Sequence, residues 1–315
     1  MKPVLFALAL ALSLMSYPGI AAPRISIEKD AVRDDPIEAL HPPASMEEIR
    51  ILSHGSTMNG LIYLPGGSGP HPIVLFLHGY PGNERNLDIA QAVRRAGYAA
   101  LYFDYRGAFG SGGTFTFPHA LEDVSSVLAW VRNGKNAAKY RLDPSRIAVF
   151  GHSFGGWLAL TSVAHEAAGV CIATPAAWNP GWVVQRFGAH PEELAEVLAY
   201  YQTTTHANSG PIKANAYSLV RDMHDHAQEW DYDSQANALK DHAILLIAGT
   251  TDTPDEGVER ETELTNEIRA KGGKQVQMVT FEDDESFSSH RLALADAVVQ
   301  WLRSDCHRSQ SVPAG

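Results

Sequence analysis

The chain is predicted to be an α/β protein whose mostly parallel sheet is covered by helices on both faces. Two observations predict this class. Short apolar runs that suit buried strands alternate with runs that suit helices from residue 72 onward. In the middle of the chain, a strand pattern over 146–150 and a helix pattern over 157–164 are separated only by Gly151-His152-Ser153-Phe154-Gly155-Gly156. A strand that turns into a helix so abruptly needs glycines on both sides, because the two elements approach closely.

The first 22 residues, 1–22, are predicted to be a secretory signal peptide. Lys2 precedes an apolar run over 4–15, which is too short to cross a bilayer, and small residues follow over 19–22. We expect cleavage after Ala21 and a secreted or periplasmic protein; an uncleaved membrane anchor is the alternative. No later stretch is long and apolar enough to cross a membrane, so we expect no stable membrane span after cleavage.

The main domain is expected over residues 49–304. Residues 23–48 are charged and contain prolines, which indicates an extended lead-in. Within the domain, β-type residues over 49–52 and 58–64 predict an antiparallel hairpin.

Four elements between the hairpin and the central turn follow the α/β rhythm. Each strand is a continuous apolar run, which is typical of a strand buried on both faces. The expected elements are a strand over 72–77, a helix over 87–96, a strand over 98–103 and a helix over 122–133.

The alternation of expected strands and helices is interrupted once in the second half of the chain. After a strand over 170–174, residues 175–241 hold three tryptophans and helical runs. We interpret this stretch as a helical cap over the C-terminal edge of the sheet, where open α/β sheets bind ligands; a peripheral appendage without substrate contact is the alternative. The remaining expected elements are a strand from Ala243 that leads into Gly249-Thr250-Thr251-Asp252, a helix over 256–271, a strand over 276–281, a loop over 282–290, a helix over 292–302 and a C-terminal tail over 305–315.

Charge and metal-ligand patterns exclude two classes of partner. The net charge of −11, from 25 basic and 36 acidic residues, offers nucleic acid no basic surface. His224 and His226 lie among acidic residues. Side chains two positions apart on a helix point to different sides, so we interpret this stretch as a solvated charged face and expect neither a metal nor a cofactor.

The sequence contains two cysteines, Cys171 and Cys306, which could form one disulfide. An oxidising compartment would permit one. The sequence cannot show that the two Cα atoms come within bridging distance, so a buried free Cys171 is the favoured interpretation.

Ser153 is the candidate nucleophile. The sharp turn would hold its hydroxyl at a helix N-terminus, where free N–H groups and the helix dipole favour developing negative charge. Asp252 and His290 follow it in the chain, each at or just beyond the end of an expected strand.

This order of serine, aspartate and histidine resembles that of the α/β-hydrolases. The chain is most similar to their dienelactone-hydrolase and prolyl-oligopeptidase-type branch. The motifs that carry the resemblance are His78-Gly79-Tyr80-Pro81-Gly82, Asp104-Tyr105-Arg106-Gly107, the central Gly151-His152-Ser153-Phe154-Gly155-Gly156, and Gly249-Thr250-Thr251-Asp252.

The resemblance implies roles for individual residues. Ser153 would be the nucleophile, and the backbone N–H groups of Tyr80 and Phe154 would form the oxyanion hole. Asp252 would orient the base, with Asp255 as the less favoured alternative.

One departure from the family pattern concerns the base. The family histidine commonly stands before a small residue and a phenylalanine, but Glu285 stands before Ser286 and Phe287 here. A carboxylate with an ordinary pKa is a poor base for a serine hydroxyl. His290, five residues on, is the nearest histidine; it is either the base or an exposed residue at a helix start. His78 and His152 are expected to shape the site entrance.

The sequence therefore predicts a secreted serine hydrolase that cleaves carboxylic esters of small molecules through an acyl-enzyme on Ser153, with Asp252 and His290 completing the triad. Two alternatives stay open. One is a peptidase or amidase of the prolyl oligopeptidase type. The other is a catalytically impaired, ligand-binding relative, marked by Glu285.

Overall fold

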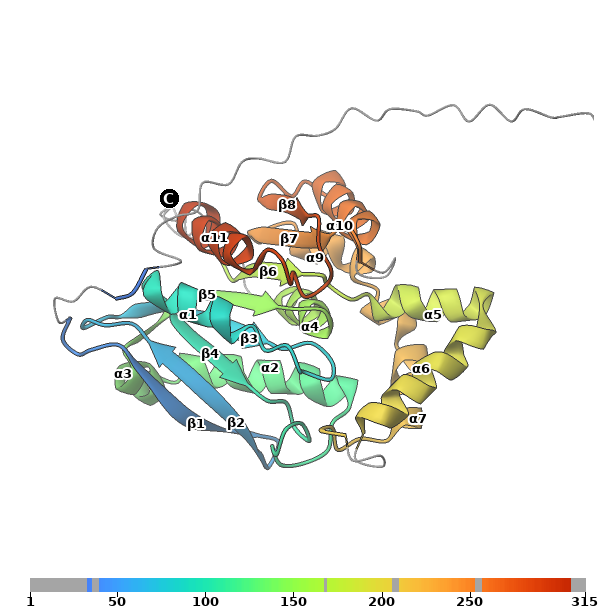
Figure 1. Cartoon of the computed structure of the whole chain (residues 1–315), viewed down its shortest axis with the longest axis horizontal. Coiled ribbons are helices and arrows are strands. Elements are labelled where there is room, and N and C mark those ends of the chain that lie inside the picture. The colour runs from blue at the N-terminus through green and yellow to red at the C-terminus, as the bar shows by residue number, and fades with distance from the viewer. Residues whose placement is uncertain (1–32, 36–39, 167–168, 206–209, 253–256, 307–315) are drawn as a thin grey trace, which may run out of the picture.

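A single eight-stranded sheet forms the centre of the protein (Figure 1). The computed structural model describes residues 33–35, 40–166, 169–205, 210–252 and 257–306. The predicted signal peptide lies outside the described residues, as do most of the lead-in and most of the C-terminal tail. Within the described part, the strand order is β1-β2-β4-β3-β5-β6-β7-β8.

The first strands are antiparallel and the rest are parallel, which confirms the predicted sheet. β1 (Ser45–Ser53) and β2 (Ser56–Leu64) form the hairpin, and β2 pairs antiparallel with β4 (Ala99–Phe103). β1 begins inside the segment expected to be lead-in. The parallel part consists of β4, β3 (His71–Leu77), β5 (Leu142–Gly151), β6 (Cys171–Pro175), β7 (Ile244–Gly249) and β8 (Val276–Phe281).

Helices cover both faces of the sheet. In β3, Ile73, Leu75 and Leu77 pack into the core of one face, whereas Val74 and Phe76 pack into the core of the other. Because both faces are covered, the strand is apolar at nearly every position. The first face carries α2 (Phe117–Arg132), α3 (Gly134–Tyr140), α4 (Phe154–Val163) and α10 (Val258–Ala270), and the second carries α1 (Leu87–Arg95) and α11 (Arg291–Trp301).

The helix expected over 122–133 begins earlier, at Phe117. Thr116 caps its N-terminus by accepting a hydrogen bond from the His119 N–H at 3.1 Å, and Pro118 occupies the first turn. Proline is tolerated there because the first helical N–H groups have no intrahelical partner. Pro118 hid this first turn from the sequence pattern.

The segment over 175–241 is helical and lies at the end of the sheet nearest the C-terminal ends of the central strands (Figure 1). Its α6 packs against both α5 and α7. Its elements are α5 (Pro180–Ala189), α6 (Pro191–Thr204), α7 (Ala216–Asp225), α8 (Ala227–Trp230), the 3₁₀ helix η2 (Tyr232–Gln235) and α9 (Ala236–Leu239).

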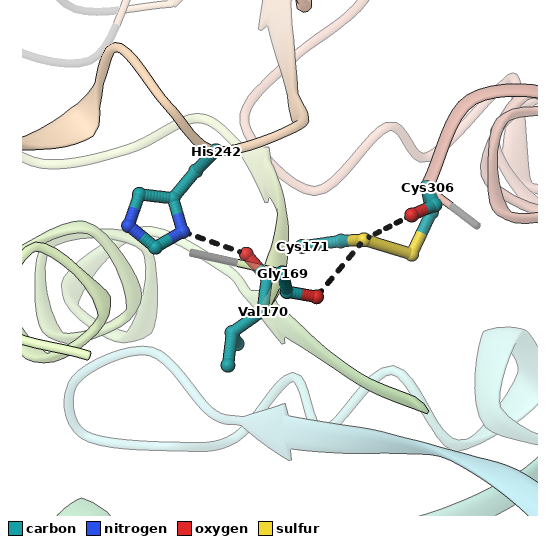
Figure 2. Close-up of a disulfide and its surroundings, with 5 residues drawn as sticks. All are labelled: Gly169, Val170, Cys171, His242 and Cys306. Atoms are coloured by element: carbon teal, nitrogen blue, oxygen red, sulfur yellow. Dashed lines mark hydrogen bonds between the residues drawn. A yellow bond between two sulfur atoms is a disulfide. The ribbon is translucent and has the colours of Figure 1, made fainter. Parts of the chain in front are cut away.

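Cys171 and Cys306 form a disulfide, so the expectation of a free Cys171 is wrong (Figure 2). Cys171 opens β6, and Cys306 ends the short π-helix η3 (Leu302–Cys306) that continues α11. This path brings the two Cα atoms to 5.5 Å, although 135 residues separate them in sequence. The approach depends on how α11 packs, which no local pattern reveals.

Removing this disulfide is expected to lower the free energy of unfolding by about 2–5 kcal/mol, because the bridge restricts a long loop in the unfolded chain. Urea denaturation of the Cys171→Ser/Cys306→Ser double variant measures the loss. Reductant should shift the unfolding midpoint of the wild type and leave that of the variant in place. Equal midpoints for the two proteins would contradict the prediction.

Arg106 and Asp123 form a buried ion pair behind the loop that follows β4. Arg106 donates from its Nε to Asp123 Oδ1 at 2.6 Å and from its backbone N–H to Oδ2 at 2.8 Å, and the Ser53 hydroxyl donates to Oδ1 at 2.6 Å. Asp123 is completely buried. These contacts fix the Asp104-Tyr105-Arg106-Gly107 motif against α2.

Asp123→Asn is expected to cost about 3–5 kcal/mol of unfolding free energy, because the buried guanidinium of Arg106 loses its buried counter-charge and keeps only the partly exposed Glu122. Glu122→Gln is the matched control: Glu122 also pairs with Arg106, but its side chain is 43% exposed. That change should cost about 1 kcal/mol or less. Thermal or urea unfolding compares the two variants, and similar losses would refute the assignment of the buried pair.

Candidate active site

Ser153 lies in a strained turn between β5 and α4. Its φ of 52° and ψ of −116° form a conformation that residues other than glycine rarely adopt. A Cβ on Gly151 would lie 2.0 Å from the Gly155 carbonyl oxygen, and a Cβ on Gly155 would lie 2.1 Å from that of Leu77. Close backbone approach therefore explains both glycines of the Gly-x-Ser-x-Gly pattern.

The two residues whose backbone N–H groups are expected to form an oxyanion hole, Tyr80 and Phe154, line the first cavity together with Ser153. Phe154 is the first residue of α4, and Tyr80 follows β3. Within the described part of the chain, neither backbone N–H donates a hydrogen bond to another group. A β3 loop and a helix N-terminus thus supply the donors that an acyl-transfer site would use.

Ser153 lies at the junction of two cavities. The first, of about 230 Å³, is lined mostly by aromatic and aliphatic side chains: Tyr80, Phe117, Phe154, Trp178, Val183, Val197, Tyr200 and Tyr201, together with Ser153 and Glu285. The second, of about 220 Å³, is more polar and is lined by Gly79, Tyr80, Pro81, Gly82, Asn83, Glu84, His152, Ser153, Tyr200, Glu285 and Ser286. Residues of α5 and α6 therefore line the space above the candidate nucleophile.

Helix α6 is hydrogen-bonded to the loop after β3. The Tyr200 hydroxyl donates to the Tyr80 carbonyl at 3.2 Å, and the Tyr80 hydroxyl lies 2.7 Å from that of Thr204. Burial raises the pKa of Tyr80 above its ordinary value, so its phenol is neutral. These contacts join the cap to the segment that carries one candidate oxyanion donor.

The structure places Glu285, and not His290, among the residues that line these two cavities. His290 immediately precedes α11, and its Nδ1 lies 2.9 Å from Asp283 Oδ2, which also accepts from the Ser289 N–H at 2.9 Å. The His290 ring packs beside Phe281. This local turn holds the imidazole outside both cavities, so the assignment of His290 as the base stays a prediction that the site geometry does not favour.

Asp252 follows the C-terminal end of β7, just as Ser153 follows the C-terminal end of the parallel strand β5. Its Oδ2 would lie 3.0 Å from a Cβ on Gly249. Burial raises the pKa of the neighbouring Glu261 well above its ordinary value, and the charge of Asp252 acts in the same direction. Asp252 lines neither cavity, and its role in orienting a base stays a prediction. The alternative residue, Asp255, lies outside the described residues.

The two histidines expected at the entrance occupy different positions. His78 is buried against Tyr105, with ring centroids 4.2 Å apart, and burial lowers its pKa to about 4. His78 lines neither cavity. His152 lines the second cavity, and its Nε2 lies 2.9 Å from the Glu285 carbonyl oxygen.

Two kinds of site are absent from the described residues. These residues contain no helix long and apolar enough to span a membrane. They also contain no group of three or more potential metal ligands, and the His224 side chain is 79% exposed beside Asp225.

Residues 54–244 match the X-Pro dipeptidyl-peptidase family, S15, over more than half of the chain. The chain belongs to this family. The match and the fold confirm the predicted resemblance to α/β-hydrolases.

The relatives of this S15-family chain include esterases and a peptidase. Over 153 residues it is 31% identical to carboxylesterase NlhH of Mycobacterium tuberculosis, covering 44% of this chain and 46% of NlhH. The fold is similar to Est1E of Butyrivibrio proteoclasticus, solved with ferulic acid (TM-score 0.60, 16% identity, 82% of this chain and 98% of Est1E). It is also similar to acylaminoacyl peptidase of Pyrococcus horikoshii (TM-score 0.59, 14% identity, 84% of this chain and 42% of the peptidase). The chain spans about half the length of the curated relatives it matches.

Sequence reasoning missed the cap side chains that border the site of this S15-family chain. Val183, Val197, Tyr200 and Tyr201 line the first cavity, and Glu84 lines the second. The aromatic residues of 175–241 were the available signal, but their spacing does not show which ones face Ser153.

Proposed function

We propose that the chain is a serine hydrolase that cleaves carboxylic esters through an acyl-enzyme on Ser153. The observation that carries this proposal is the strained Ser153 at the junction of two cavities, one of which Tyr80 and Phe154 also line. NlhH is named a carboxylesterase and Est1E was solved with ferulic acid bound, and both support an ester substrate.

In the proposed reaction, the Ser153 oxygen attacks the ester carbonyl, and the N–H groups of Tyr80 and Phe154 stabilise the oxyanion. The alcohol leaves, and water releases the acid from Ser153. The acyl group would occupy the first cavity, whose 230 Å³ is small for a ligand pocket. We therefore expect compact apolar acyl groups, such as a short chain or a single aromatic ring.

Turnover of p-nitrophenyl acetate and butyrate, together with labelling by a fluorophosphonate, tests this function. Mass spectrometry should locate the phosphonyl adduct on Ser153. Absence of both turnover and labelling at high probe concentration would refute the hydrolase proposal and favour a ligand-binding relative.

The peptidase alternative is supported by the family itself, whose name describes X-Pro dipeptidyl-peptidases. An aminoacyl-proline p-nitroanilide, assayed beside the esters, separates the two activities. A larger kcat/KM for the anilide than for every ester would assign the chain to peptide hydrolysis.

We further propose that the protein is exported after cleavage of residues 1–22. The Cys171–Cys306 disulfide supports export, because such bridges persist in oxidising compartments. Cell fractionation and N-terminal sequencing should find a periplasmic or extracellular protein that begins near Ala22. A cytoplasmic protein that retains Met1 would contradict this proposal.

A further inference from the structure

His152 has one ring nitrogen whose protonation state is fixed by its surroundings. Its Nε2 lies 2.9 Å from the backbone carbonyl oxygen of Glu285. A carbonyl oxygen only accepts hydrogen bonds, so Nε2 carries the hydrogen. In the neutral ring, Nδ1 then holds a free lone pair and can accept a proton.

This Nδ1 lies near the candidate nucleophile, on the other side of Gly79. A Cβ placed on Gly79 would lie 3.4 Å from His152 Nδ1 and 3.4 Å from the Ser153 Cβ. All three residues line the second cavity. The His152 side chain is buried, with 4% of the residue exposed, and Nδ1 has no hydrogen-bond partner among the described residues. A buried nitrogen without a partner calls for an explanation, and a transferable proton supplies one.

We propose that His152 accepts the proton of Ser153 during acyl transfer, in place of the histidine that is missing at position 285. This inference rests on the proposed serine hydrolase. Among the residues that line the two cavities, His152 is the one histidine. A base acts within hydrogen-bond reach or through one water, and a catalytic hydrogen bond that is long in the free enzyme can tighten in the complex with substrate.

The surrounding charges suit a base that is neutral at rest. Burial lowers the pKa of His152, whereas its hydrogen bond to the Glu285 carbonyl and the charges of Glu285 and Glu84 oppose that effect. Arg291 acts in the same direction as burial. The ring is therefore neutral before reaction, and the two carboxylates stabilise the imidazolium that forms. Glu285 contributes its backbone carbonyl to the ring orientation and its carboxylate to the charge balance.

Each proton has a defined donor and acceptor in this scheme. As the Ser153 oxygen bonds to the carbonyl carbon, its proton moves to His152 Nδ1 and the carbonyl electron pair moves to the oxyanion. When the carbonyl re-forms, the bond to the leaving alcohol breaks and Nδ1 returns the proton to that alcohol. Water then attacks the acyl-enzyme and gives a proton to Nδ1, which passes it to the Ser153 oxygen as the acid departs.

His152→Gln tests the base directly. The glutamine amide can still donate to the Glu285 carbonyl, but it has no basic nitrogen. We expect kcat/KM for p-nitrophenyl butyrate to fall by about 10²-fold or more, while His224→Gln, at an exposed histidine, keeps wild-type turnover. His152→Ala leaves space for a small base, so free imidazole should restore part of its turnover. A purely structural role would give no rescue.

Each outcome decides the inference. Wild-type turnover by His152→Gln overturns it, as does a loss in both variants without imidazole rescue. If His290→Ala loses turnover and His152→Gln does not, the base is His290. If the variants fail to fold, the wild-type pH profile decides: because the pKa of His152 is lowered, kcat/KM should fall to half of its plateau at a pH below 6.5, and a midpoint above 6.5 contradicts the inference. A wild type without turnover or labelling overturns the proposed function as well, whereas an active wild type with an active His152→Gln overturns only this inference.

Discussion

In the His152→Gln background, which lacks the proposed base, Glu285→His is expected to raise the kcat for p-nitrophenyl butyrate by about 10²-fold, the lower end of the usual contribution of a positioned base. Glu285 lines both cavities beside Ser153 and stands before Ser286 and Phe287, where the resembling family carries its histidine. An imidazole there has an ordinary pKa of about 6.5, which suits proton transfer from serine at neutral pH better than a carboxylate does.

Glu285→Gln in the same His152→Gln background separates the gained base from the lost charge. This variant removes the carboxylate and supplies no base, so the kcat values of the two variants should differ by the full factor of about 10². Steady-state kinetics of both proteins at pH 7–8 give the comparison. If Glu285→His is no faster than Glu285→Gln, a histidine at this position cannot reach the nucleophile.

Ser153→Ala is expected to lower ester turnover by about 10³-fold or more and to abolish fluorophosphonate labelling, because no other group forms the acyl-enzyme. Ser162→Ala is the matched control, since Ser162 lies on the same helix, α4, and lines neither cavity. Near-UV circular dichroism should show the same tertiary packing in both variants.

Residual turnover near the wild-type rate in Ser153→Ala would exclude the acyl-enzyme mechanism. If fluorophosphonate labelled another serine in Ser153→Ala, the nucleophile would be assigned to that serine. Either result would leave the fold unchanged and remove the basis for assigning the two cavities to an ester.

The sequence predicted the features that depend on local patterns. Continuous apolar runs such as 73–77 are required by burial on both sheet faces, so the parallel strands could be placed in order. The turn around Ser153 could be placed because two glycines are required by contacts within a few residues or with one neighbouring strand.

Features that depend on tertiary packing or on one particular side-chain partner could not be predicted. The Cys171–Cys306 bridge needs the last helix to return to the start of β6. The orientation of His290 depends on Asp283, whose carboxylate organises the turn before α11. The position of His152 depends on a carbonyl 133 residues away in sequence. In each case the sequence shows the residue, but it does not show which group that residue contacts.

The hydrogen bonds between α6 and the loop after β3 link substrate access to catalytic competence. Tyr200 holds the Tyr80 carbonyl, and Thr204 contacts the Tyr80 hydroxyl, so displacement of α6 would pull on the peptide unit next to a proposed oxyanion donor. A widened entrance would then come with a disturbed anion-binding geometry. Larger substrates that force the helix outward would consequently lose reaction rate as well as affinity.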